Sequence, residues 1–310
     1  MNNAALAGTG LVVLYTLMIS SADAITKFIA KGYAAPQMFA VSGLIVAVLS
    51  LGTARLRSQK QSLRTSCPRA MALRVCLTVI GSVAFFYAFR LLPFAEVFVF
   101  IGMVPLFAGL FSGLVLQEHV RPMAWAALGA GFVGVLCLFP QGIASVTPGH
   151  IIALVACFCG TLSMIIARYI GRYETNALAQ VFYPNLSLGV VMAAALPFVY
   201  QAMPLTDLLW VAAYGGVLFV ARWLLVVSLR LLAAYAVTPL MNLQFVWMVA
   251  LGAVFFGEIP EGNIYLGVAI VISSGIFLVY DQMAPERVRT NWLARAQSRL
   301  DLRHRKTKEI

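Results

Sequence analysis

The chain has 310 residues, of which 62% are hydrophobic and 11% charged, and its mean hydropathy is +0.91. A soluble domain has roughly a quarter of its residues charged, so this composition excludes a water-soluble protein and indicates a chain that lies mostly in lipid. The 22 Lys and Arg exceed the 11 Asp and Glu and give a formal net charge of +11. We assign this excess to membrane topology and to attraction by anionic lipid, not to nucleic-acid binding.

Ten apolar segments follow one another along the chain, separated by short stretches rich in Pro, Gly and charged residues. Because a span needs about 20 apolar residues, we predict ten membrane spans, at residues 5–30, 35–54, 70–91, 94–117, 122–139, 149–171, 176–200, 206–229, 234–257 and 263–281. All are predicted to be helices, since a segment in hydrocarbon must satisfy its own backbone hydrogen bonds and these segments are too long for barrel strands.

The cations are distributed unequally over the connections between the predicted spans. Most lie in the even-numbered connections, such as Arg55 to Arg74 in the second, and in a basic tail at residues 282–310. Cytoplasmic connections are enriched in Lys and Arg, so we predict a multi-pass protein of the inner (cytoplasmic) membrane with both termini cytoplasmic. The tail is expected either to lie on the inner leaflet as a cationic helix or to form a disordered anchor.

The two halves of the chain resemble each other at a shift of 140 residues. Arg90 and the two leucines after it fall on Arg230 and the two leucines after it, and Glu118 falls on Glu258. Each half contains five predicted spans, so the second half enters the membrane from the side opposite to the first. The sequence therefore predicts an all-α membrane protein with ten transmembrane helices in two inverted five-helix repeats around a central cavity. The repeats occupy residues 1–140 and 148–281.

The fourth predicted span and its counterpart carry related motifs. A proline precedes a glutamate at the end of the segment, from Pro105 to Glu118 in the first half and from Pro239 to Glu258 in the second. With ten spans and a duplicated unit of five, the sequence resembles the EamA-type branch of the drug/metabolite transporter superfamily. The Ala-Glu-Val opening at residues 95–97 is similar to the branch that contains the bacterial aromatic amino acid exporter. The resemblance implies a basket of helices around a cavity, with the fifth and tenth spans packed outside.

Asp23 is a charged residue inside the first predicted span, where charge is costly and typical of a functional site. Thr16, Ser20, Asp23 and Lys27 fall at i, i+4, i+7 and i+11, so they share one face of a helix. We expect this face to point into the cavity and to bind substrate. The alternative for Asp23 is an ion pair with Lys27 near the membrane surface.

Arg222 lies in the eighth predicted span and has no acid within four residues on its own helix. It is expected to bind a carboxylate of the substrate, or alternatively to hydrogen-bond polar atoms of neighbouring helices. Small-molecule sites are mostly apolar with a few polar groups, so nearby aromatic, Met, Thr and Asn residues complete the predicted substrate site. These residues are Tyr87, Phe98, Phe100, Met103, Tyr183, Thr238, Met241, Asn242 and Phe245.

Together these features predict a secondary transporter that exports small amphipathic metabolites by alternating access. Asp23 and Arg222 would suit the ammonium and carboxylate of an amino acid, and the aromatic residues would suit an apolar or aromatic side chain. Export or import of another metabolite class, such as a nucleoside, a vitamin or a drug-like cation, is the alternative. Proton exchange through Asp23 and facilitated diffusion both remain open as the mode of coupling.

Other classes of function lack the motifs that they need. H-E-x-x-H, G-x-S-x-G and P-loop motifs are absent from the sequence, so neither an intramembrane enzyme nor an ATP-driven pump is expected. The five Cys and three His have no metal-ligand spacing, and no metal or cofactor is predicted. The charge rings and glycine filter loops typical of channels are missing too. The expected partners are a small-molecule substrate and membrane lipid, with the chain acting as a monomer.

Overall fold

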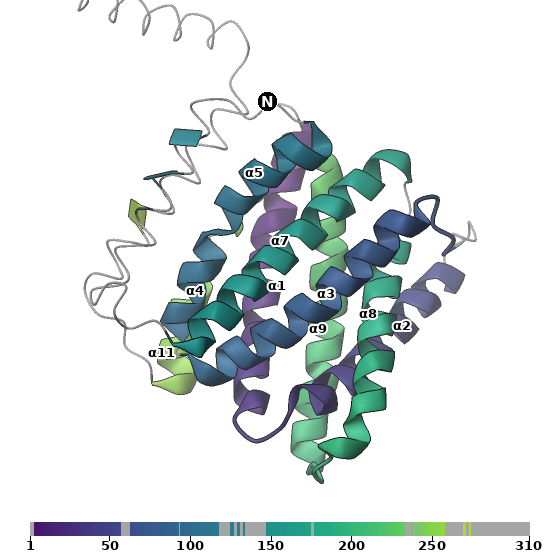
Figure 1. Cartoon of the computed structure of the whole chain (residues 1–310), viewed down its shortest axis with the longest axis vertical. Helices are drawn as coiled ribbons and strands as arrows, with labels where there is room; N and C mark the ends of the chain where they lie inside the picture. The colour runs from purple at the N-terminus through teal and green to yellow at the C-terminus, as the bar shows by residue number, and fades with distance from the viewer. Residues whose placement is uncertain are drawn as a thin grey trace, which may run out of the picture.

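The structure is a computed structural model of the chain, and it contains helices and no strands among the residues that it describes (Figure 1). Those residues are 3–56, 63–92, 94–117, 147–174, 177–232 and 243–257, with isolated positions between these ranges. The predicted spans at 122–139 and 263–281 lie almost entirely outside the described residues, and the basic tail lies wholly outside them.

Six helices are long and apolar enough to cross a membrane. Each coincides within a few residues with a predicted span, which confirms the helical prediction for these segments. They are α1 (Asn3–Ala30), α2 (Ala35–Leu56), α3 (Pro68–Leu91), α7 (Pro148–Tyr173), α8 (Ala177–Ala195, continued by a 3-10 turn at Leu196–Phe198) and α9 (Leu205–Leu231).

The fourth predicted span forms two helices instead of one. α4 (Phe94–Gly102) ends before Met103, and α5 (Val104–Leu116) begins directly after it. Pro105 explains the break, because proline has no N–H for the preceding turn and is favoured in the first turn of a new helix. The ninth predicted span is described mainly as α11 (Gln244–Phe256).

In the described part of the chain, the main helix contacts join the first half to the second. α3 packs along α7, α2 along α8 and α1 along α9, while α1 also contacts α11 and α5 contacts α7. Figure 1 shows α3 and α7 side by side at the front, with α1 and α9 behind them. The halves are therefore interleaved, and any space at the centre is bounded by helices from both.

The ends of the paired helices define their directions. At the start of α1, a Cβ on Gly8 would meet the side chain of Leu232 at the end of α9, 2.8 Å away. At the start of α7, a Cβ on Gly149 would meet Leu92 at the end of α3, 2.9 Å away. Both pairs are therefore antiparallel.

Three arginines that the sequence assigned to connections lie inside helices. Arg168 and Arg172, in the last turns of α7, donate from Nη1 to the carbonyl oxygens of Leu232 and Leu116, each at 2.7 Å. Such bonds satisfy carbonyls that a helix end leaves without partners. Arg74 lies in α3 and is 5% exposed, so its assignment to the second connection was wrong.

Candidate functional site

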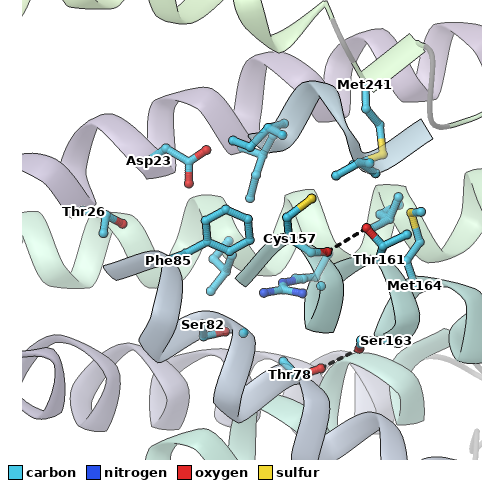
Figure 2. A pocket seen from close by; sticks show the side chains of 18 of the residues that line it. Asp23, Thr26, Thr78, Ser82, Phe85, Cys157, Thr161, Ser163, Met164 and Met241 are labelled. Carbon is cyan, nitrogen blue, oxygen red and sulfur yellow. Dashed lines mark hydrogen bonds between the residues drawn. The ribbon is translucent and has the colours of Figure 1, made fainter. Parts of the chain in front are cut away.

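A cavity of about 160 Å³ lies between α1, α3, α7 and α9, with contributions from α2, α4, α5 and α11. Its walls are mostly apolar, with a small number of polar side chains, as in most small-molecule sites. In Figure 2, Asp23 and Thr26 lie toward one end of the cavity, and Met164 and Met241 lie toward the other. The polar or charged lining residues, tyrosines and cysteines aside, are Asp23, Thr26, Arg74, Thr78, Ser82, Thr161, Ser163, Arg222 and Gln244.

Asp23 is presented by one face of α1. Tyr15, Ile19, Asp23 and Thr26 all line the cavity, and their spacing of four, four and three residues places them on one side of the helix. Within the described residues the Asp23 carboxylate accepts no hydrogen bond, and the charge that acts on it is that of Arg222. Asp23 is thus available to a ligand in the cavity.

The other three polar residues expected on this face do not line the cavity. Thr16 Oγ1 donates to the carbonyl oxygen of Val13 at 2.6 Å and accepts from Trp247 Nε1 at 3.2 Å. Ser20 is fully buried, and Lys27 Nζ lies 4.2 Å from the ring centroid of Phe94 in a cation–π contact. The cavity meets α1 along a neighbouring stripe, and Asp23 sits where the two stripes meet.

Arg222 is presented by α9 in the same way. Tyr214, Leu218, Arg222 and Leu225 line the cavity, again with spacings of four, four and three residues. The Nε of Arg222 is buried and has no hydrogen-bond partner among the described residues. The sequence placed this guanidinium in a cavity, and the structure places it in the one that contains Asp23.

Arg74 is a lining residue that the sequence analysis missed. Its Nη1 donates to the backbone oxygen of Gln180 in α8, and its Nε is buried without a hydrogen-bond partner in the described part of the chain. The signal was present in the sequence, because Arg74 lies inside the apolar run that starts at Pro68. Counting it with the basic connection hid a second cavity guanidinium.

Most of the aromatic and Met residues proposed for the substrate site pack in the protein core instead. Phe98 and Phe245 are 1% exposed and contact each other with ring centroids 4.7 Å apart. Tyr87, Phe100, Met103 and Tyr183 also pack against core clusters and do not line the cavity. Met241 does line it, and Thr238 and Asn242 lie outside the described residues. The aromatic lining consists of Tyr15, Phe39, Phe85, Phe86, Phe89 and Tyr214.

Several hydroxyl groups of the cavity wall are already engaged. Thr78 and Ser163 join α3 to α7 through a hydrogen bond of 2.8 Å, and Thr161 donates to the carbonyl oxygen of Cys157 at 2.7 Å (Figure 2). Asp23, Arg74 and Arg222 are the remaining charged groups of the described lining, so the cavity holds one carboxylate and two guanidiniums. No group of three His, Cys, Asp or Glu in the described residues is placed to hold a metal ion.

Comparison with known proteins identifies the family. Residues 6–139 match the model of the EamA-like transporter family. The chain belongs to this family. An EamA-like chain is a multi-pass membrane protein, and the six long apolar helices agree with that assignment.

Several relatives of this EamA-like chain are named as transporters of small molecules. A "Riboflavin transporter" of Rhizobium johnstonii is 28% identical over 235 residues, which cover 73% of this chain and 75% of that protein. An "S-adenosylmethionine uptake transporter" of Rickettsia bellii is 22% identical over 224 residues, covering 72% and 76%. A crystal structure matches with a TM-score of 0.71 at 17% identity, over 92% of this chain and 100% of that chain, and shows the fold. This EamA-like chain is therefore a transporter of small molecules.

Proposed function

We propose that this chain carries a small heteroaromatic metabolite, of the vitamin or nucleoside kind, across the cytoplasmic membrane by alternating access. The observation that carries the proposal is the cavity at the centre of the bundle, where aromatic rings from α1, α2, α3 and α9 surround three charged side chains. Flat ring systems pack well against aromatic walls, and the charged groups fix the orientation of the ligand.

The printed names of the relatives favour this class over amino acids. Riboflavin and S-adenosylmethionine both contain a heteroaromatic ring system, and relatives of this chain are named for their transport. Asp23 and Arg222 remain a suitable pair for a zwitterion, so amino acids belong in the same assay as a competing substrate class.

The contacts between the helices support two inverted repeats. The antiparallel pair formed by Gly8 and Leu232 corresponds, at a shift of 140 or 141 residues, to the pair formed by Gly149 and Leu92. The cavity follows the same relation, because Asp23 corresponds to Met164 and all of these positions lie on helices that exchange under the shift. We infer ten spans in two units, 1–140 and 148–281, with the termini and the basic tail in the cytoplasm.

Alternating access follows from such an arrangement. Two repeats that enter the membrane from opposite sides form a bundle whose two faces are built alike, so one closed on the outside and one closed on the inside have similar energies. Substrate binding at the junction of the halves then accompanies the opening of the cavity to either side.

Transport in liposomes tests the proposal. The purified chain is reconstituted, and the flux of labelled riboflavin, adenosine and phenylalanine is measured in both directions against protein-free liposomes. We expect saturable flux of a ring-bearing vitamin or nucleoside, with competition by the unlabelled compound. Saturable flux of phenylalanine without flux of either heteroaromatic compound would overturn the substrate class in favour of amino acids, and the absence of any saturable flux would overturn the proposal.

A further inference from the structure

The cavity contains more positive than negative charge. Arg74 from α3 and Arg222 from α9 face it together with the single carboxylate of Asp23. The charge of Arg222 acts on both Asp23 and Arg74, so the two guanidiniums share one electrostatic environment. A buried positive charge without an anion is costly, which makes this excess a feature that requires an explanation.

Other acids in the described residues do not supply the missing anion. Glu174, whose charge also acts on Arg74, accepts hydrogen bonds from Thr65 Oγ1 at 3.0 Å and from the backbone N–H of Ser66 at 2.7 Å, at the end of α7. It is therefore engaged in joining α7 to the start of α3. It does not line the cavity.

Each guanidinium retains donor capacity. The Nε of Arg74 and the Nε of Arg222 are buried and have no hydrogen-bond partner in the described part of the chain. Arg74 is held in place by its bond to the backbone oxygen of Gln180 and is 5% exposed. Guanidinium groups bind carboxylate and phosphate oxygens with fixed, paired hydrogen bonds, so two of them beside one cavity suit an oxyanion.

We propose that Arg74 and Arg222 bind the oxyanion, a carboxylate or a phosphate, of an aromatic substrate whose ring packs against Phe85 and Phe89. The inference rests on the proposed function and makes it narrower, because it assigns an anionic group to the transported molecule. The ring and the anion then occupy neighbouring parts of one cavity, since Arg74, Phe85 and Phe89 all line it from α3.

Ligand-induced stabilisation of the purified protein tests this inference. Benzoate and benzamide have nearly the same shape and differ in charge, and phenyl phosphate offers the other oxyanion. The melting temperature is measured in detergent with each compound at constant ionic strength. We expect benzoate or phenyl phosphate to bind about tenfold more tightly than benzamide, as the loss of a charge-assisted hydrogen bond implies. Equal effects of all three compounds would overturn the inference.

Variants locate the site. Arg74→Gln and Arg222→Gln should each remove the preference for the anions, whereas Arg74→Lys, which keeps the charge, should retain part of it. Arg90→Gln is the matched control, because Arg90 lies on the same helix, is exposed and does not line the cavity. A preference for anions that survives in both Gln variants would place the anion elsewhere and contradict the assignment.

Two further comparisons separate the possible outcomes. Added phosphatidylglycerol presents the same phosphate chemistry on a lipid, and stabilisation by this lipid but not by phenyl phosphate or benzoate would overturn the inference in favour of a lipid site. Saturable flux of a neutral heteroaromatic compound with no preference for anions would leave the proposed function standing and remove the inference. Anion binding that depends on both arginines, without flux of any compound, would do the reverse.

Discussion

The Asp23 carboxylate accepts no hydrogen bond in the described structure and faces two guanidiniums across a cavity. We predict that Asp23→Asn lowers transport by at least about tenfold, because the variant loses the only negative charge of the lining and with it an interaction of a charged group with the ligand. The measurement is initial flux in liposomes at equal protein content. Asp207→Asn is the matched control and should transport normally, since Asp207 lies outside the cavity lining. Normal flux in Asp23→Asn would contradict the assignment.

Tyr33 lies in the connection between α1 and α2 and donates a hydrogen bond of 2.6 Å to Asp207 Oδ2 at the start of α9. This bond requires the protonated phenol and raises the pKa of Tyr33 above its ordinary value. The bond is therefore fully present below the ordinary value of about 10 and is lost only as the pH rises through the higher pKa of the folded protein. We predict that the difference in melting temperature between the native chain and Tyr33→Phe stays constant from pH 6 to pH 9. A difference that shrinks within this range would contradict the prediction.

Single residues of the cavity were partly predictable from the sequence. Asp23 and Arg222 were identified because charge inside an apolar span has few explanations other than a cavity or a partner. Arg74 was missed because it lies near a basic connection. Phe98 and Phe245 were assigned to the site and pack in the core, since an apolar ring suits either environment and only the packing of the helices decides which ring faces the cavity.

The crossing of α2 and α8 is the closest approach between the two halves that the described glycines reveal. A Cβ on Gly43 would lie 2.7 Å from the backbone oxygen of Asn185 and 2.7 Å from the backbone nitrogen of Gly189. The helix backbone cannot yield as a side chain does, so Gly43→Ala must push the helices apart. Overpacking of this kind costs about 1–3 kcal/mol, and we predict a lower melting temperature together with reduced transport.

Gly52→Ala provides the control on the same helix. A Cβ at Gly52 would meet no atom within 4 Å, so this variant should be as stable as the native chain or more stable, because alanine favours the helix over glycine. Thermal unfolding in detergent compares the two variants. Equal stability of Gly43→Ala and Gly52→Ala would show that the crossing does not constrain the bundle.

Whole elements were easier to predict than their interruptions. Six spans were correct within a few residues because a run of about 20 apolar residues has one stable form in lipid. The division of the fourth span at Met103 was not predicted. Its cause, Pro105, was visible, but Pro184 lies inside α8 without ending that helix, so proline alone does not decide whether a helix stops.

At the scale of the molecule, the internal shift of 140 residues predicted which helices have corresponding roles, and the contacts agree with it. The equivalent residues Gln117 and Gly257 each end a helix in the left-handed conformation, with φ of 53° and 66°. The position and contents of the cavity were not predictable in the same way. They depend on small rotations of each helix about its axis, which move a side chain between the cavity and the core without changing the sequence pattern.

The central claim is that this cavity opens alternately to the two sides of the membrane. A cysteine at Ser82, in a chain whose native cysteines are replaced, tests it with a membrane-impermeant thiol reagent applied to right-side-out and to inverted vesicles. Ser82 lines the cavity, and a cysteine at Leu114, which is 72% exposed on an apolar helix, is the lipid-facing control. The account predicts labelling of the cysteine at position 82 from both sides and little labelling at position 114. Labelling of position 82 from one side alone, or from neither, would contradict it.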